Sequence, residues 1–299
     1  MKPELAPHVI ALSLALGTAP LVAQEVEVQT VQVTDSVYML MGRGGNIGLS
    51  VGKDGAFLID DQYAPMVPRI RAAVAMVSSQ PVNFLINTHW HGDHTGGNER
   101  FGRAGAIIVA HENVRKRLNA DQFQEALSRS TPPSPSDALP IVTFNDTVTF
   151  HWNGDEIRVF HVQNAHTDGD SIIHFKNANV MHAGDTFFKN AYPFVDISSG
   201  GNFDGVIAVA KQLLEIADDE TKIIPGHGTL ATKADLQTYV EVLSTIRSRV
   251  VRLIEEGKTE DQVVEANPTA QWDATWGQGF MGPERWTRII YQSLSASRE

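Results

Sequence analysis

The chain after residue 25 alternates short runs of β-branched residues with segments of helical spacing. Residues 26–42 and 44–61 are rich in Val, Ile, Leu and Met and are punctuated by glycines, which is typical of strands. The turn Lys53–Asp54–Gly55 divides the second segment into two strands. Apolar spacing predicts a helix over 67–79, and the nearly all-apolar VNFLINT, residues 82–88, predicts a strand buried on both faces.

The second half of the chain repeats this order of strands followed by a helix. Residues 147–185 predict a strand meander with turn signals at Asn153–Gly154 and Asn177–Ala178. The other expected elements are a strand and helix over 106–120, helices from about Phe203 to Ala217 and Lys233 to Glu256, a strand over 221–228, and two short final helices. We therefore expect an α/β (α+β) fold in which two sheet-plus-helix halves bury their sheets between helices.

Two segments fall outside this periodic pattern. Residues 1–24 carry Lys2 and then an apolar stretch with Ala23 before the expected cut, which predicts a signal peptide and a periplasmic or secreted protein. A membrane anchor is the alternative, but the stretch is short and contains Pro20. Residues 130–140, STPPSPSDALP, predict a loop. Residues 25–299 then form one domain with a helical tail over about 240–299.

The composition of the chain excludes some kinds of binding partner and limits the kinds of metal ligand. The net charge of −11 argues against nucleic acid, whose binders cluster Lys and Arg, and so disfavours a nuclease. No apolar run after residue 24 reaches the length of a membrane span, so we expect no stable membrane insertion and a small-molecule substrate. The chain has no cysteine, so a metal would be held by nitrogen and oxygen alone.

Three histidines and an aspartate crowd into NTHWHGDHTGG, directly after the predicted strand 82–88. His89 and His91 are two residues apart, so on an extended backbone both imidazoles face one metal. Asp93 and His94 follow Gly92 and can face a second position. Other ligands must come from distant segments, and His166, Asp185 and His227 each stand beside or near glycine at a predicted strand end. Such strand ends are where sites collect in α/β proteins.

This set of motifs resembles the metallo-β-lactamase superfamily. The motifs His-x-His-x-Asp-His, a later His, Gly-Asp and Gly-His-Gly occur in the order typical of that family, between about Val37 and Tyr239. The resemblance implies a four-layer αββα sandwich and a site for two zinc ions. Matching positions imply His89, His91 and His166 for the first zinc, Asp93, His94 and His227 for the second, and Asp185 as the bridge.

The resemblance also implies a hydrolase in which a hydroxide on the metals attacks an amide or ester carbonyl. Zinc lowers the pKa of bound water to about 7, and one ion polarises the carbonyl while the other stabilises the leaving group. Asp93 is accordingly expected to be catalytic as well as a ligand. An all-nitrogen-and-oxygen ligand set also suits iron or manganese.

The substrate is less defined than the metals. Well-known β-lactamases of the family carry a cysteine at the position of Asp185 and no histidine at that of His94, whereas thioesterases and lactonases resemble this chain at both. A class B-like β-lactamase is one reading, because an exported enzyme meets β-lactams and GGNFDG, residues 200–205, resembles a lactamase segment. The alternatives are a lactonase, a thioester hydrolase of glyoxalase type, or a non-hydrolytic di-iron redox or binding protein.

Softer matches each have two readings. Asn202 in GGNFDG is either a catalytic amide that polarises the carbonyl or the cap of the following helix. Loop 43–46 is either a flap over the site or a hairpin turn. Lys189 lies one position from the spacing of a carboxylate-binding lysine, which favours a surface lysine. Asp60 is either a carboxylate that orients metal ligands, the favoured reading, or a turn residue.

Other histidines and aromatics fit structural roles better. We expect the six histidines outside the motif to be surface or hydrogen-bonded residues, namely His8, His111, His151, His161, His174 and His182. Four aromatic residues follow the last long helix, namely Trp272, Trp276, Phe280 and Trp286. We expect them to pack the terminal helices together rather than to form a cap over a ligand.

Overall fold

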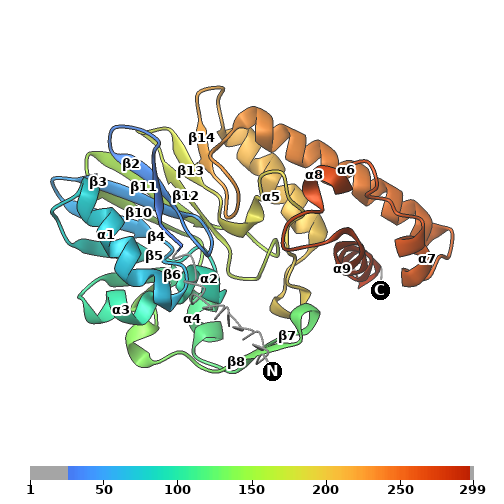
Figure 1. Cartoon of the computed structure of the whole chain (residues 1–299), viewed down its shortest axis with the longest axis horizontal. Coiled ribbons are helices and arrows are strands. Elements are labelled where there is room, and N and C mark those ends of the chain that lie inside the picture. The colour runs from blue at the N-terminus through green and yellow to red at the C-terminus, as the bar shows by residue number, and fades with distance from the viewer. Residues whose placement is uncertain (1–25, 297–299) are drawn as a thin grey trace, which may run out of the picture.

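The structure, a computed structural model, describes residues 26–296 as two facing β-sheets with helices on both outer faces (Figure 1). The four-layer αββα sandwich expected from the sequence is thereby confirmed. The signal peptide predicted over 1–24 lies outside the described residues. No helix within the described range has both the length and the apolar character that a membrane span needs.

The first sheet is built by the N-terminal half of the chain. Its strands lie in the order β1 (Gln29–Gln32), β2 (Val37–Met41), β3 (Ile47–Gly52), β4 (Gly55–Ile59), β5 (Val82–Ile86), β6 (Ile107–His111) and β9 (Val142–Phe144). The pairs from β1 to β4 are antiparallel, and those from β4 to β9 are parallel. The all-apolar β4 and β5 lie inside the sheet, where helices and the second sheet cover both faces.

The second sheet follows as the predicted meander. Its order is β10 (Thr147–Trp152), β11 (Asp155–His161), β12 (Ser171–Phe175), β13 (Val180–His182), β14 (Lys222–Ile224) and β15 (Ala231–Thr232). Asn153 and Asn179 take positive φ at the two turns, a conformation that asparagine tolerates. β13 and β14 pair in parallel through a crossover that contains α5 (Phe203–Ile216).

Apolar side chains between the sheets hold the layers together. Phe57 of the first sheet packs edge-on against Phe175 and Phe150 of the second. Side chains from both sheets fill this layer without solvent exposure, including Ile59, Ile86, Val159 and Ile173. The parallel pairing places the carboxyl ends of β4, β5, β13 and β14 where the two sheets meet at one edge. Six of the seven predicted metal ligands follow the ends of β5, β13 and β14, and His166 lies in the loop after β11 (Asp155–His161).

Helices cover the outer faces. α1 (Val67–Val77) and α3 (Asn98–Arg103) cover the first sheet, and α4 (Glu112–Leu118) follows β6. α5, α6 (Lys233–Glu255) and α9 (Pro283–Ala296) cover the second sheet. α6 begins at a capping box in which Thr232 and Asp235 satisfy each other's backbone amides. Three short or medium helices follow α6 rather than two, because α8 (Asp273–Trp276) lies between α7 (Glu260–Glu265) and α9.

Several elements were absent from the sequence prediction, among them the short strands β9 and β15 and one hairpin. Residues 122–131 form the hairpin of β7 (Gln122–Gln124) and β8 (Arg129–Thr131), which lies at the bottom of Figure 1. Its polar residues carry no hydrophobic period, so the pattern gave no signal for strands. The predicted loop 130–140 begins inside β8 and otherwise contains only a short helical turn at Ser136–Ala138.

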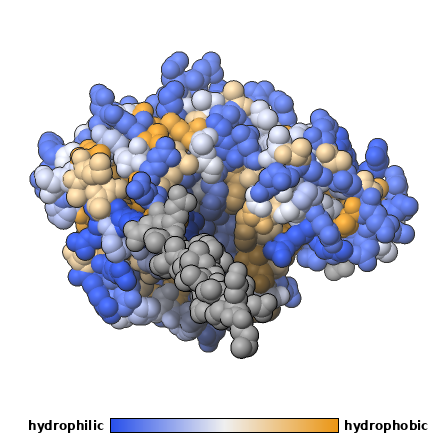
Figure 2. All heavy atoms as spheres, viewed as in Figure 1, coloured by the Kyte–Doolittle hydropathy of each residue, from blue (hydrophilic) through white to orange (hydrophobic). Residues whose placement is uncertain are grey.

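The C-terminal helices pack onto the sandwich through aromatic rings. Trp286 of α9 is fully buried, stacks on Tyr192 at 4.2 Å between ring centroids, and donates from Nε1 to the carbonyl of Pro193. Trp276 is also buried, whereas Phe280 is 64% exposed. Packing therefore explains Trp276 and Trp286 but not Phe280. The face seen in Figure 2 is mostly hydrophilic, with hydrophobic residues in smaller patches.

Replacing Trp286 by alanine is expected to lower the free energy of unfolding by about 3–5 kcal/mol, because a buried ring is lost. Denaturant titration followed by circular dichroism measures this change. Met76→Ala is the matched control, because Met76 is 83% exposed and its side chain buries little surface. A loss below about 1 kcal/mol for Trp286→Ala would show that α9 does not depend on this contact.

Candidate metal centre

The structure brings all seven predicted ligand side chains together at the edge where the sheets meet. They form two groups of nitrogen and oxygen atoms, each within 4.8 Å, made of His89, His91, His166 and Asp185, and of Asp93, His94 and His227. The first group is buried, and the second is partly open. Their role as ligands stays a prediction, but their convergence from four separate segments is a property of the fold.

Local structure explains how one short stretch serves both groups. β5 ends at Ile86, and His91 has extended backbone angles as the N-cap of α2 (Gly92–Thr95). This single turn of helix then carries Asp93 and His94 to the second group. Asp185 lies in a turn after β13. The preceding residue, Gly184, packs closely against this stretch, because a Cβ on Gly184 would lie 2.9 Å from the Cβ of Thr88. Gly184 also has φ of +50°, which favours glycine.

Asp60 is the carboxylate that orients this stretch. Its Oδ1 accepts the Thr88 backbone N–H at 2.7 Å, and its Oδ2 lies 2.7 Å from both Thr88 Oγ1 and His94 Nδ1. Asp60 also takes φ of +61° at the end of β4, so both readings of this residue hold. The bond to Nδ1 turns His94 Nε2 toward Asp93 and Asp185.

The first-group histidines are oriented in the same way. Thr88 Oγ1 lies 3.0 Å from His89 Nδ1, and Asp196 Oδ2 lies 2.9 Å from His91 Nε2. The carbonyl of Phe194 accepts from His166 Nδ1 at 2.7 Å. Each bond fixes one ring nitrogen and leaves the other for the cluster, the arrangement typical of metal-bound histidine. Sequence reasoning missed Asp196, which stands in DISSG without a recognisable spacing to His91.

Asp170 supports the loop that carries His166. Its Oδ2 accepts the backbone N–H groups of His166 at 2.6 Å and Thr167 at 2.8 Å, and its Oδ1 accepts from the Thr167 hydroxyl. Burial raises the pKa of Asp170 to about 7 despite these bonds. Sequence reasoning also missed this residue. The motif DGD after His166 is nevertheless typical of a turn in which an aspartate side chain accepts hydrogen bonds from nearby backbone N–H groups.

Atoms at the centre of the cluster lack ordinary partners. His89 Nε2, His94 Nε2 and Asp185 Oδ1 are buried without a hydrogen bond. Asp185 Oδ1 lies 3.1 Å from His94 Nε2, and Asp185 Oδ2 lies 3.5–3.6 Å from the Nε2 atoms of His227 and His166. Ligand atoms around one tetrahedral zinc lie about 3.3 Å apart. The seven residues therefore fit two metal ions in donor type, orientation and spacing.

The electrostatics of the cluster also favour bound cations. Burial alone would lower the pKa of His227, but attraction from Asp185 and Asp93 raises it to about 9. His94 is raised above its usual pKa in the same way, against burial, by Asp185, Asp93 and Asp60. Burial lowers the pKa of His166 to about 4. The carboxylates thus draw positive charge into the site, and metal ions would displace those protons.

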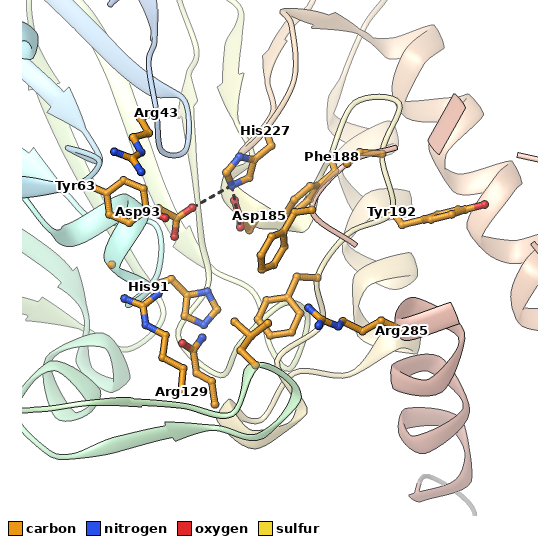
Figure 3. A pocket seen from close by; sticks show the side chains of 17 residues that line it. Arg43, Tyr63, His91, Asp93, Arg129, Asp185, Phe188, Tyr192, His227 and Arg285 are labelled. Atoms are coloured by element: carbon orange, nitrogen blue, oxygen red, sulfur yellow. Dashed lines mark ion pairs between the residues drawn. The ribbon is translucent and has the colours of Figure 1, made fainter. Parts of the chain in front are cut away.

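A pocket of about 610 Å³ opens over the second group (Figure 3). His91, Asp93, Asp185 and His227 lie at its base. Phe188 stacks on the ring of His227 with 4.9 Å between centroids, and Phe194 stacks on His91 at 5.8 Å. A small molecule entering this pocket therefore meets the predicted metal ligands directly.

Loop 43–46 touches both sides of the cluster. The Gly45 N–H donates to the carbonyl of Asp93 at 3.0 Å, and a Cβ on Gly45 would lie 2.0 Å from the His94 ring. Asn46 Nδ2 donates to the carbonyls of Pro225 and Gly228, on either side of His227. These bonds hold the loop against the cluster, and its role as a flap stays a prediction.

Asn202 and Lys189 have structural partners. Asn202 Oδ1 accepts the backbone N–H groups of Asp204 and Gly205 as the N-cap of α5, and Asn202 is not among the described residues that line the pocket. Its catalytic role stays a prediction that this geometry does not favour. Lys189 Nζ pairs with Asp235 at 3.0 Å and donates to the carbonyl of Leu230. Lys189 is thus a partly buried, ion-paired residue rather than the surface lysine expected from the sequence.

The histidines outside the motif lie outside both ligand groups. His111 and His161 stack on each other at 3.8 Å, and His182 Nε2 donates to the carbonyl of Asn46. His151 and His174 belong to strands β10 and β12. His8 lies outside the described residues. A clustered motif, rather than histidine itself, was therefore the informative signal.

Asp185→Asn is expected to remove the carboxylate that contacts both groups. Because changes around metal ligands cost about 10–100-fold in affinity, loss of this ligand is expected to weaken retention of one ion by at least about 100-fold. Metal content after dialysis, measured by atomic emission, tests this. His111→Ala serves as the control and should leave metal content unchanged. Equal metal content in Asp185→Asn and the native protein would exclude Asp185 from the site.

Asp60→Asn is expected to lower metal affinity about 10–100-fold without touching the metals, since His94 loses its charged partner. Asparagine tolerates the positive φ at this position, so the backbone is preserved. Competition with a chromophoric chelator measures the affinity. Asp137→Asn, at an exposed ion pair with Arg103, is the control. Native affinity in Asp60→Asn would show that His94 does not need this hydrogen bond.

Comparison with known proteins agrees with this geometry. The chain is 22% identical over 208 residues to an acyl-coenzyme A thioesterase (MBLAC2) of Bos taurus, which covers 64% of this chain and 72% of that protein. It is 25% identical over 199 residues to a hydroxyacylglutathione hydrolase of Nitrosococcus oceani, which covers 62% of this chain and 66% of that relative, just under two thirds of its length.

Among solved structures, the DIM-1 metallo-β-lactamase superposes with a TM-score of 0.59 at 17% identity. The match covers 99% of that chain but 74% of this one, so this protein contains the whole fold and further residues besides. The family model of the metallo-beta-lactamase superfamily matches residues 40–227, which contain all seven residues of the cluster. The chain therefore belongs to the metallo-β-lactamase superfamily and is a hydrolase of that family, with two His/Asp groups that could hold metal ions.

Proposed function

We propose that the protein is a two-zinc hydrolase that cleaves an acyl ester or thioester bond. The observation that carries this proposal is the position of Asp185 between the two ligand groups. Its Oδ1 faces His94 of the second group, and its Oδ2 faces His166 of the first. A single carboxylate shared in this way, beside a full set of imidazoles, suits two ions held close together.

Each residue of the site has a defined task in this proposal. His89, His91 and His166 would hold one zinc ion, Asp93, His94 and His227 the other, and Asp185 would lie between them. When bound, the ions supply Lewis acidity for the carbonyl and lower the pKa of a water molecule. The carboxylates of Asp60 and Asp196 keep the imidazoles in place, so that no reorganisation is needed during reaction.

The thioester alternative has more support than the β-lactam reading. The two relatives described above are named as an acyl-coenzyme A thioesterase and a hydroxyacylglutathione hydrolase. The aspartate at 185 and the histidine at 94 also match what the resemblance implies for the thioesterase branch of the family. The β-lactam reading rests partly on GGNFDG, where Asn202 caps α5. We accordingly propose an acyl thioester or ester, including a lactone, as substrate. Export to the periplasm or beyond remains part of the proposal, on the sequence of residues 1–24.

Purified protein loaded with zinc is expected to hydrolyse thioesters and esters faster than penicillins or cephalosporins, and a chelator should abolish turnover. Rates over a panel of thioester, ester, lactone and β-lactam substrates, with and without chelator and after zinc is restored, test this. Turnover that survives complete metal removal would overturn the metal mechanism. About two zinc ions per chain are expected, and stoichiometric iron with no hydrolysis would favour the redox alternative.

A further inference from the structure

The pocket above the metal centre has two chemically different sides (Figure 3). Arg43, Tyr63 and Arg129 line one side, next to Asp93 and His91. Phe188, Phe194 and Phe280 line the other side, together with Arg285. A substrate that reacts at the base of this pocket therefore extends along a cationic wall in one direction and an aromatic wall in the other.

The arginines of the cationic wall have no carboxylate to neutralise them. The acidic side chains that line the pocket are Asp93 and Asp185, and both belong to the predicted metal centre. Elsewhere Arg117, Arg247 and Arg288 form ion pairs, but among the described residues neither Arg43 nor Arg129 lies within 4.0 Å of a carboxylate oxygen. The chain has a net charge of −11, so two guanidinium groups without a carboxylate partner on one wall of a pocket suggest an anionic ligand.

Both arginines are close to the reacting position. Arg43 stands in the loop whose neighbour Gly45 is hydrogen-bonded to the carbonyl of Asp93. A terminal nitrogen of Arg129 lies 4.0 Å from the position that a Cβ would take on Gly92, between His91 and Asp93. Both guanidinium groups also act electrostatically on the hydroxyl of Tyr63. The three side chains thus come from three separate segments, namely loop 43–46, the turn at Tyr63 and strand β8.

The opposite wall is mainly aromatic and carries one guanidinium group, that of Arg285, at the start of α9. Phe188 and Phe194 stack on the imidazoles of His227 and His91, and Phe280 is 64% exposed although it is large and apolar. An exposed aromatic ring at the rim of a pocket gains free energy when a ligand covers it. The apolar part of a substrate would lie here, which leaves its polar part toward the arginines.

We propose that Arg43 and Arg129, with the hydroxyl of Tyr63, form an oxyanion subsite that selects an acyl substrate carrying a carboxylate or phosphate on one part and an apolar group on the other. Guanidinium groups bind both anions through paired N–H donors, so the shared chemistry is a planar or tetrahedral oxyanion. This inference rests on the proposed ester or thioester hydrolysis, because the anion is recognised while the acyl bond lies over the metals.

Matched substrates separate anion recognition from hydrolysis. Two pairs of thioesters are used. Within each pair, one member carries a terminal carboxylate and the other carries a carboxamide of the same shape. The group stands on the acyl part of the substrate in one pair and on the thiol part in the other. The zinc-loaded native protein is expected to prefer the carboxylate member of at least one pair by about tenfold or more in kcat/KM. A phosphate analogue of that member then compares the two oxyanions.

Removing the arginines should remove the preference and spare the chemistry. In Arg43→Gln/Arg129→Gln, the ratio of kcat/KM between carboxylate and carboxamide is expected to fall to about 1–2, while the carboxamide rate stays within about twofold of native. Arg129→Lys should retain part of the ratio, since the charge remains without the planar pair of donors. Arg71→Gln, at an exposed arginine of α1 away from this pocket, should keep the native ratio.

A binding measurement accompanies the rates. Calorimetry with the carboxylate product is expected to show about tenfold weaker binding to the double variant than to native protein, with no change for the carboxamide product. A carboxylate-to-carboxamide ratio of kcat/KM near 1 in the native protein would overturn the subsite. So would a native ratio in the double variant, because the anion would then be bound by the metals rather than by these arginines. Absence of turnover for every thioester would instead overturn the proposed function, which keeps the two failures distinct.

Discussion

Desolvation of the charged cluster is the constraint on which the rest of the structure depends. Five imidazoles and two carboxylates meet at the edge between the sheets, and most of them are buried. Burying such groups is costly unless each is paired or bound to a cation. The fold meets this requirement with fixed partners, among them Asp60, Asp196 and the carbonyl of Phe194. The remaining nitrogens face inward, where metal ions would complete the pairing.

The two-sheet architecture supplies the rigidity that this arrangement needs. Asp60 follows β4, His89 follows β5, Asp185 follows β13 and His227 follows β14. Close-packed rings and branched side chains between the sheets fix these four strand ends relative to one another. Shifting one sheet against the other would separate Asp185 from His94, and the shared position between the groups would be lost. The core therefore sets the geometry of the site as well as the stability of the fold.

The sequence predicted the fold layers and the seven clustered residues because both leave a local signature. Runs of β-branched residues indicated the strands, and the spacing around His89 indicated the metal motif. Asp196 and Arg129 were missed because each lies near the cluster only in the folded chain. Asp196 contacts His91, 105 positions away, and Arg129 lies near Gly92, 37 positions away. No spacing rule predicts contacts between residues so far apart in the sequence. The hairpin β7–β8 was missed because its strands have three residues each and Phe123 is the one apolar side chain in them, so no alternation could be detected.

The base and the rim of the pocket come from different parts of the chain relative to the range that matches the family model. The residues of the predicted metal cluster all lie within 40–227, the range of the family model, whereas Phe280 and Arg285 lie beyond it, before α9 and in its first turn. Trp286 stacks on Tyr192 and so joins α9 to the pocket wall. The candidate metal centre thus lies inside the part of the chain that matches the family model, while the rim of the pocket includes residues from the C-terminal segment. Differences in substrate are therefore expected to arise in the walls rather than at the metals.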